Sequence, residues 1–538
     1  MKKPLIYLLV CLTALLSSCQ SKKESSGDKK VSNFRMNSHS EPTSLDPRLI
    51  SDIPSVTTAK ILFDGLCRMT EQGATPSLAL KIEVSEDKKC YSFHLKKSLW
   101  SNGEPITAHD FEYSWKSILD PNFPAQYAHQ LFILKNGALA KMGAVPTSGV
   151  GVRALADDLL VVELEHPSNY FLELTAFPLC YPVNRQTDEN NPEWANCDGK
   201  SFVCSGPFNL IQWRKGADVV VQKNPLYWES EVVQLDQITL SFIEDEHTEL
   251  NMYENGELDW AGSPNSSIPP EALPELQQRA NTELFVLPIA GTYCYKFNTK
   301  VAPFHSQKIR QAFAYAIDRK ILIDNILQAH QIAAQALIPP CVVANHQDLP
   351  NAKGLAEAKA LFEQACTEEG WNQESFPPVT LIFSRSEKHH KMAQAVQQQW
   401  NEAFGIKVAL QSYEWNTFVQ KLNQRDYQVG GRGWVSDLSD PLALLEIYKQ
   451  TNDAPSGGGN DTHWHNKSFA RLLEEAKRCP DPTRRTLLLN EAETILMEQM
   501  PIAPLYHSTA CYLKKSYVKG VYLSKLCDLD FKYAYFDD

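Results

Sequence analysis

The chain has 538 residues, of which 43% are hydrophobic and 10% aromatic, and its formal net charge at pH 7 is −12. This length and composition predict about two to four globular domains with sizeable hydrophobic cores. Nucleic acids and anionic lipid surfaces attract lysine and arginine, so the acidic balance argues against both as partners. We therefore expect the partner to be a small solute or another protein.

The first residues of the chain predict export. Two lysines precede a twelve-residue run, 5–16, that is almost entirely apolar. The run is too short to span a bilayer but has the length of the hydrophobic part of a signal peptide. It ends in Leu-Ser-Ser-Cys at 16–19, the pattern of a bacterial lipobox. We expect residues 1–18 to be removed and Cys19 to be acylated; the alternative is an ordinary secretory signal with a chance cysteine.

Residues 19–32 comprise this cysteine and a polar segment with too few apolar side chains to fold. A flexible segment of this length has an r.m.s. reach of roughly 20 Å, so it predicts a tether. No later segment is long and apolar enough to cross a membrane. We therefore expect the lipid alone to anchor the protein, on the periplasmic side of the cell envelope.

Cysteine usage leaves the disulfide pattern open. Eleven cysteines remain after Cys11 leaves with the signal and Cys19 takes lipid, and this odd number leaves at least one thiol free unless a partner is bridged. No Cys-x-x-Cys pair occurs. Cys197 and Cys204 are the closest candidates for a disulfide, and small buried apolar side chains are an equally good interpretation.

The segment 100–118 shows strong local signals. Asn-Gly at 102–103 favours a tight turn, and Thr107 with Asp110 forms the pattern of a capping box that opens a helix. Three apolar side chains would then share one face of this helix: Phe111, Trp115 and Ile118.

The second half of the chain alternates strand and helix patterns. A strand at 379–383, a helix that ends at Gly405 and a strand at 406–410 predict a βαβ unit with parallel strands. Apolar spacing predicts a further amphipathic helix over 307–320. Asp-Pro at 481–482 is typical of a helix start, and this helix would end before Pro501. The pattern indicates a mixed α/β protein of several lobes.

The stretch 100–115 also closely resembles a signature of the extracytoplasmic solute-binding proteins of bacterial ABC peptide importers, the oligopeptide- and dipeptide-binding family. Further markers of this family occur in family order and cover nearly the whole mature chain. They lie at 43–47, 205–208, 224–228, 256–259, 303–319 and 433–441.

The resemblance implies an α/β fold with two hinged lobes, a ligand cleft between them, and a third, inserted domain. Such lobes close over their ligand by a hinge motion, and the membrane transporter is expected to recognise the closed form. The implied division of the chain is as follows: lobe I, 33–63 with 182–290 and 505–538; inserted domain, 64–181; lobe III, 291–504.

The resemblance also implies site residues. Asp437 matches the aspartate that pairs with the α-ammonium group of a peptide, since a buried ion needs a counter-ion. Trp434 and Trp415 match aromatic walls of the cleft. Tyr293 and Tyr295 lie on the strand that enters lobe III, where an extended ligand is expected to take main-chain hydrogen bonds.

Three departures from the family pattern leave the ligand open. Relatives often carry an arginine three residues before the tryptophan, whereas here that position is Gly431 and the arginine is adjacent, at Arg432. A tyrosine of the inter-lobe strand is replaced by Cys294. The acidic residue expected before Ile-Pro at 53–54 is Ser51, or has moved to Asp52. Ligand length and the restriction to ordinary peptides therefore stay open.

The expected function is that of a monomeric, non-catalytic receptor, without cofactor or metal, that captures peptides and delivers them to an ABC permease. The common hydrolase, zinc-protease and ATPase signatures are absent from the sequence. One alternative is a receptor of the same fold for a nickel complex, haem or a murein peptide. His463 and His465 would favour a metal if they shared one face of a strand, although solvated loop histidines are the better interpretation. A less favoured alternative is an exported peptidase or hydrolase.

Overall fold

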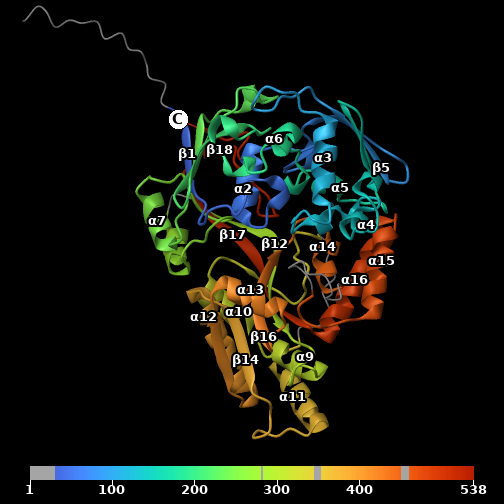
Figure 1. The fold of residues 1–538 in the computed structure, drawn as a ribbon. Coiled ribbons are helices and arrows are strands. Elements are labelled where there is room, and N and C mark those ends of the chain that lie inside the picture. Colours follow the sequence, from blue (N-terminus) through green and yellow to red (C-terminus); the bar gives the residue numbers. More distant parts are fainter. Residues whose placement is uncertain (1–30, 280–282, 344–352, 450–459, 538) are drawn as a thin grey trace, which may run out of the picture. The chain divides into compact units, whose positions relative to one another are not determined.

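The computed structural model describes residues 31–279, 283–343, 353–449 and 460–537 (Figure 1). The predicted signal peptide, Cys19 and most of the predicted tether lie outside the described residues. Asn33–Asp538 forms one compact unit, distinct from Met1–Ser32. Within the described ranges, no helix combines the length and the apolar character needed to cross a membrane.

One eleven-stranded sheet runs through both predicted lobes. Ten of its strands form a continuous path, and β13 (Ile332–Ala333) pairs with β17 beside that path. In order across the sheet, the path is β15 (Val408–Tyr413), β14 (Val379–Ser384), β16 (Val429–Val435), β12 (Leu284–Phe297), β17 (Ile502–Lys514), β11 (Trp260–Gly262), β1 (Asn33–Asn37), β10 (Gln237–Ser241), β9 (Asp218–Lys223) and β8 (Phe208–Arg214).

The two longest strands, β12 and β17, connect the lobes as an antiparallel pair. They have 14 and 13 residues, and the first half of β12 pairs with the part of β17 that reaches β11 of lobe I. The second half of β12 pairs with β16 of lobe III. Between these halves the register shifts, since Pro288 lies opposite Thr509 whereas Thr292 lies opposite His507. Such an interruption of the ladder bends a strand pair and suits a hinge.

The lobe III end of the sheet confirms the predicted βαβ unit. β14 runs parallel to β15, and helix α12 (Glu387–Phe404) links them. Its buried side chains include Met392, Val396 and Trp400, as the spacing predicts. The helix ends at Gly405, whose φ of 68° lies in the left-handed region that favours glycine.

The helix predicted over 307–320 is wrong in its extent. It divides into α9 (Gln307–Tyr315) and α10 (Arg319–Leu322). The reason is Asp318, whose carboxylate accepts hydrogen bonds from the backbone N–H groups of Lys320 and Ile321 and so starts a new helix. The helix predicted after Asp481 is confirmed as α16 (Pro482–Gln499), and the Asp481 side chain caps it.

The predicted inserted domain, 64–181, contains an antiparallel sheet and the predicted helix α3 (Ala108–Ile118). The backbone N–H of Thr107 donates to the Asp110 carboxylate over 2.8 Å, which confirms the capping box. The predicted apolar face of α3 is buried. The strands of this sheet, in order, are β4 (Ala79–Val84), β5 (Cys90–Leu95), β7 (Leu159–Glu163) and β6 (Val152–Ala156).

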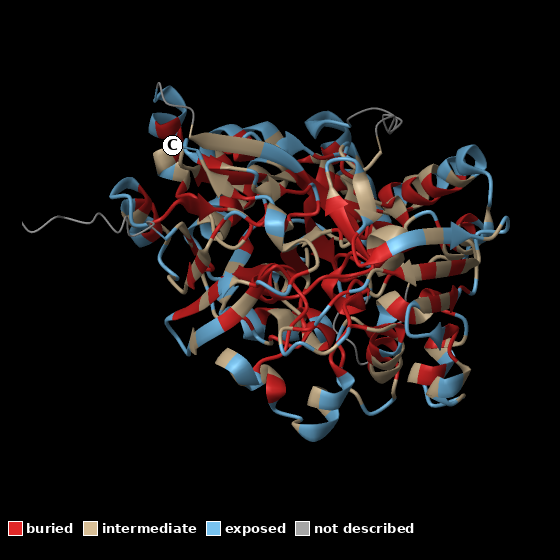
Figure 2. Ribbon diagram, turned by 90° about the horizontal axis from the view of Figure 1, so that it is seen from above, coloured by how far each residue is buried: buried red, intermediate tan, exposed pale blue. Residues whose placement is uncertain are grey.

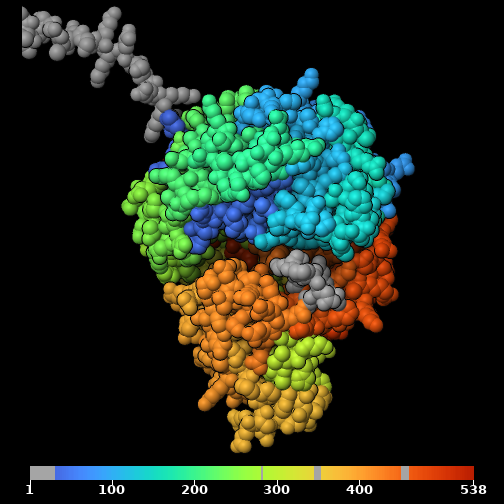
Figure 3. Space-filling model, viewed as in Figure 1, coloured from blue at the N-terminus to red at the C-terminus, as the bar shows by residue number. Residues whose placement is uncertain are grey.

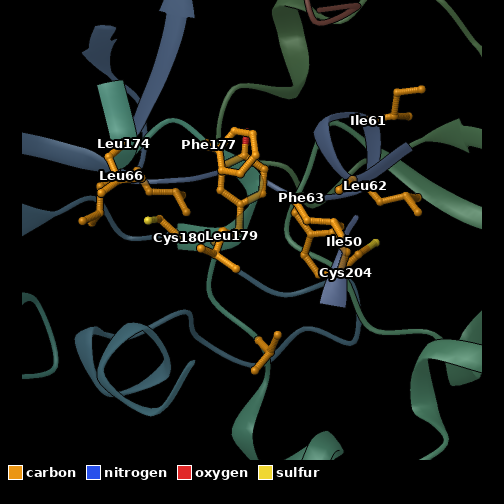
Figure 4. Packing of buried hydrophobic residues seen from close by; sticks show 14 of the residues in the cluster. Ile50, Ile61, Leu62, Phe63, Leu66, Leu174, Phe177, Leu179, Cys180 and Cys204 are labelled. Atoms are coloured by element: carbon orange, nitrogen blue, oxygen red, sulfur yellow. The ribbon is translucent and has the colours of Figure 1, made fainter. Parts of the chain in front are cut away.

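The hydrophobic interior is divided between the lobes. The predicted lobe I and inserted domain share one large cluster. Figure 4 shows part of it, with Leu62 and Phe63 of the predicted lobe I and with Phe177 and Leu179 of the predicted inserted domain. Lobe III has separate clusters on the two faces of its part of the sheet. Figure 2 shows buried residues concentrated inside and exposed residues on the outer faces of helices. Most members of each cluster thus come from one predicted lobe, although the first cluster also includes Leu438 of the predicted lobe III.

The disulfide considered between Cys197 and Cys204 is absent, and all eleven cysteines that the structure describes are free. Cys204 is buried, its Sγ lies 3.6 Å from the carbonyl oxygen of Phe208, and burial raises its thiol pKa to about 12. The Cys197 Sγ instead donates to the carbonyl oxygen of Glu193 over 3.6 Å. Cys204 therefore packs as a small apolar side chain.

The remaining elements cover these sheets or join them. The other helices are α2 (Ile53–Leu62), α4 (Gly137–Lys141), α5 (Phe171–Leu174), α6 (Arg185–Asn190), α7 (Glu246–Glu254), α8 (Leu273–Gln278), α11 (Leu355–Glu369), α13 (Trp415–Asn423), α14 (Pro441–Leu445) and α15 (Lys467–Arg478). The short strand pairs are β2 (Cys67–Thr70) with β3 (Gly73–Pro76), β18 (Val518–Lys519) with β21 (Tyr535–Phe536), and β19 (Tyr522–Leu523) with β20 (Leu529–Asp530).

Candidate ligand-binding site

Strand β16 has a free edge over part of its length. Figure 3 shows a furrow between the blue and green surface of the predicted lobe I and the orange surface of the predicted lobe III. β12 pairs with the whole of β16, but β14 pairs only with Val429 and Gly430 on the other side. From 431 to 435, no strand in the described part of the chain occupies that second edge. Gly433 in this stretch is exposed. An extended ligand could therefore add to β16 as a further strand.

The expected main-chain binding at Tyr293 and Tyr295 is wrong. Both residues lie in the part of β12 that is flanked by β16 on one side and β17 on the other. An internal strand has no free edge for a ligand, since its N–H and C=O groups already face two neighbouring strands. A ligand contact through the tyrosine side chains stays a prediction.

Strand alternation separates the tyrosines from the other predicted residues. Tyr293 lies opposite Gly433 and Tyr295 opposite Gly431, whereas Arg432 lies opposite Cys294. Successive side chains point to opposite faces of a sheet, so both tyrosines occupy the face away from Arg432 and Trp434. The Tyr293 ring is buried and stacks on Tyr506, with the ring centroids 5.3 Å apart. The tyrosines thus belong to the core of lobe III.

Arg432 lies near both predicted tryptophans. Its guanidinium carbon is 6.0 Å from the ring centroid of Trp415 and 5.8 Å from that of Trp434. Trp415 is the first residue of α13 and is 53% exposed, whereas Trp434 is half-buried against the cluster around Cys294. The two rings favour the charged guanidinium at this position through cation–π attraction. The structure therefore brings these three residues together at the free edge of β16.

Asp437 lies two residues beyond the end of β16 and is half-buried. Its Oδ2 accepts a hydrogen bond from Nε2 of Gln130 over 3.1 Å. Burial and the nearby carboxylate of Asp528 raise the pKa of Asp437 to about 7, although the bond from Gln130 lowers it. No cation of the described residues offsets this effect. A ligand ammonium group would supply the missing positive charge.

Three parts of the chain meet around Asp437. Tyr127 of the inserted domain has its pKa raised by burial and by the carboxylates of Asp437 and Asp52, while Arg432 lowers it. Asp52 caps α2 in lobe I, where its carboxylate accepts from the backbone N–H of Ser55 over 2.8 Å. The predicted lobe I, inserted domain and lobe III therefore each contribute a polar side chain to this region.

Sequence reasoning missed Tyr127 and Gln130. Gln130 precedes Asp437 by 307 positions, and no periodicity or spacing pattern relates them. The two residues lie in or beside a short 3₁₀ segment, Ala128–Ile133, which has no strong pattern of its own. Only the tertiary arrangement brings them to the site.

A second space between the lobes has charged walls. It is a cavity of about 530 Å³. The lobe I wall includes Glu246 and Glu271, while the lobe III wall includes Lys388 and Lys391 from the first turns of α12. Opposite charges that face each other across such a space attract the two walls.

The histidines considered as metal ligands do not form a strand face. Residues 460–466 contain no strand, and His463 has a left-handed φ of 59°. Its Nδ1 lies 3.4 Å from Nη1 of Arg425, and the neighbouring His465 is exposed. Within the described ranges, no group of three or more His, Cys, Asp or Glu side chains has the arrangement of a metal site.

Two lobes joined by the paired strands β12 and β17, with a further domain beside them, are the architecture of a two-lobed solute-binding protein. Sequence comparison leads to the same class. The profile of the bacterial extracellular solute-binding proteins, family 5, middle region, matches residues 73–456. The chain belongs to this family, which is a family of binding proteins.

Individual relatives resemble the chain over nearly its whole length. The oligopeptide-binding protein OppA of Bacillus subtilis is 37% identical over 99% of this chain and 99% of the relative. Haemophilus influenzae OppA in complex with the peptide RPPGFSPFR has a TM-score of 0.82 at 27% identity, covering 94% of this chain and 99% of that one. The murein tripeptide-binding protein MppA in its unliganded open form reaches 0.73 at 27% identity, covering 94% and 98%. At equal identity, the fold is thus more similar to the peptide complex than to the open form.

Proposed function

We propose that this protein is an extracytoplasmic receptor that captures peptides between lobes I and III and delivers them to an ABC-type permease. The observation that carries the proposal is Asp437, a half-buried carboxylate to which no cation of the described residues acts as counter-ion, two residues beyond the end of β16. The peptide ligands named for the relatives agree with this chemistry.

In this proposal, the peptide binds as an extended strand along 431–435. Main-chain hydrogen bonds to a strand edge recognise a peptide without reading its side chains. The α-ammonium group pairs with Asp437, so that neither charge is buried alone. Trp415 and Trp434 form aromatic walls, and Arg432 between them is the candidate partner for the ligand carboxylate.

The division of the chain into lobe I, inserted domain and lobe III is part of the proposal. β12 and β17 act as the hinge, because they are the strands that enter both lobes and their register shifts between the two halves. Ligand between the lobes stabilises the closed arrangement by mass action. The permease then receives the closed form.

We also propose that Cys19 carries lipid and that residues 19–32 act as its tether. This anchor keeps the receptor at the membrane that holds the permease. The support is the signal pattern at 1–19 together with membership in an extracellular family.

Native mass spectrometry of protein purified from its own host tests the function directly. We expect a bound species that dissociates on denaturation and yields peptide fragment ions. Calorimetry with peptides and solution scattering complete the test, since binding should reduce the radius of gyration. Protein that holds no peptide, and that binds none at millimolar concentration, would contradict the proposal.

A further inference from the structure

The segment between β16 and α14 belongs to lobe III by sequence but packs on the inserted domain. Leu438 is 4% exposed and is part of the large hydrophobic cluster of lobe I and the inserted domain. The backbone N–H of Ser439 donates to Oε2 of Glu173 in α5 over 2.9 Å. This segment, 436–440, therefore forms a contact between lobe III and the inserted domain.

Gln130 of the inserted domain makes a further contact with this segment, through the side chain of Asp437. Its Nε2 donates to the Asp437 Oδ2 over 3.1 Å. The neighbours Leu131 and Ile133 are buried in the same large cluster, at 0% and 6% exposure. The backbone that carries Gln130 is therefore well packed, which restricts the positions that the side-chain amide can take.

Only one of the two carboxylate oxygens of Asp437 accepts a hydrogen bond from the described residues. The hydrogen bond from Gln130 uses Oδ2, and no bond to Oδ1 is found within the described ranges. A carboxylate bonded through one oxygen has a defined orientation, so its second oxygen points in one direction. An ammonium group placed there would meet an oriented acceptor.

We propose that Gln130 is a positioning residue of the ammonium site: it holds Oδ2 of Asp437 and so directs Oδ1 toward the ligand. The inserted domain then completes the site only when the segment 436–440 is docked on it, which couples ammonium recognition to closure. This inference rests on the proposed function, because it assumes that Asp437 binds the α-ammonium group of a peptide.

The groups around Asp437 give the inference a pH signature. The carboxylate of Asp528 acts on Asp437, the carboxylates of Asp437 and Asp52 act on Tyr127, and Arg432 is the cation that acts on Tyr127. The hydrogen bond from Gln130 favours the charged form of the carboxyl, and its loss should raise the pKa of Asp437 further. Removal of Gln130 should therefore shift the pH dependence of binding upward.

The test compares Gln130→Met with Gln126→Met, the same substitution at an exposed glutamine four positions earlier. Calorimetry uses alanine peptides of three to five residues as probes, each with a free and with an acetylated amino terminus. We expect Gln130→Met to weaken binding of the free peptides on the order of tenfold and to leave the acetylated peptides unchanged. Gln126→Met should behave as wild type with both.

A second readout is the pH profile between about 5.5 and 7.5, where a peptide α-ammonium group stays mostly protonated. Affinity of wild type for the free peptides should rise with pH as Asp437 loses its proton. Gln130→Met should move this rise to higher pH, which a general loss of packing would not do.

The outcomes separate the inference from the proposed function. Wild type that binds neither form of the peptides would refute both. If wild type prefers the free peptides and Gln130→Met prefers them equally, with the same pH profile, the positioning role is refuted while the proposed function stands. Equal weakening of free and acetylated peptides would likewise assign Gln130 a merely structural role.

Discussion

We expect the variant Asp437→Asn to have a higher free energy of unfolding than wild type at pH 8, and to bind peptides more weakly. In the ligand-free protein the pKa of Asp437 is raised to about 7 from an ordinary value of 3.8. The folded protein therefore keeps a proton at this carboxyl, between about pH 4 and 7, that the unfolded chain has released. Stability falls as pH rises through this range, and each tenfold difference in acid constant corresponds to about 1.4 kcal/mol. The ionised carboxylate thus lowers the free energy of unfolding by a few kcal/mol, at most about 4, above pH 7.

Asparagine keeps the shape of the side chain and an oxygen for the bond from Gln130, but it has no charge to desolvate. We expect wild type and Asp437→Asn to unfold at similar urea concentrations near pH 4. The variant should become more stable by about 2–4 kcal/mol as pH rises to 8. The exposed Asp158 provides the control, since Asp158→Asn should show no such pH-dependent difference.

The same substitution should weaken binding of a free peptide at pH 7.5 by roughly 3–5 kcal/mol, or more than a hundredfold. Acetylation of the peptide should weaken wild-type binding by a similar amount. Because both changes remove one interaction, the two together should be far less than additive. Calorimetry on the four combinations measures this coupling.

Two results would refute this reasoning. A stability difference between wild type and Asp437→Asn that does not change between pH 4 and 8 would mean that the carboxyl is not desolvated. Full additivity of substitution and acetylation would mean that Asp437 does not meet the ammonium group.

Three further predictions concern the strand edge, the charged cavity and the anchor. Gly431→Ala should lower the free energy of unfolding by about 1–3 kcal/mol in urea titrations, because its Cβ would lie 2.5 Å from the hydroxyl of Tyr293. Lys388→Met should increase the radius of gyration of the ligand-free protein, because Lys388 faces Glu246 across the cavity. The radius of gyration of the variant should also change less with salt concentration than that of wild type. Cys19→Ser should no longer incorporate labelled fatty acid or partition with membranes, because acylation requires the thiol.

Each of these predictions has a matched control. Gly433→Ala should be tolerated better than the change at 431, since its nearest contact would be 3.3 Å away. Lys407→Met removes an exposed lysine of the same lobe and should leave the radius of gyration unchanged. Cys197→Ser should still be acylated. A normal Gly431→Ala protein, an unchanged Lys388→Met radius, or membrane partitioning of Cys19→Ser would contradict the respective argument.

Local features were predictable from the sequence because neighbouring residues produce them. The capping box at Thr107 and Asp110 and the helix start at Asp481 satisfy backbone N–H groups within one turn. The spacing of apolar residues in α12 predicts which face of the helix is buried, and this prediction does not depend on the rest of the fold. The family markers are also short sequence motifs, so they can be recognised without a structure. They predicted the lobes, the strand that enters lobe III, and Asp437 as a candidate site residue.

The tertiary structure decided which of these residues share a site. Only strand pairing shows that β12 is internal and that 431–435 of β16 have a free edge. Because successive side chains of a strand point to opposite faces of the sheet, Tyr293 lies in the core whereas Arg432 faces the tryptophans. The bond between Gln130 and Asp437 joins residues 307 positions apart, so its energy depends on the packing of two separate domains and leaves no periodic trace in the sequence.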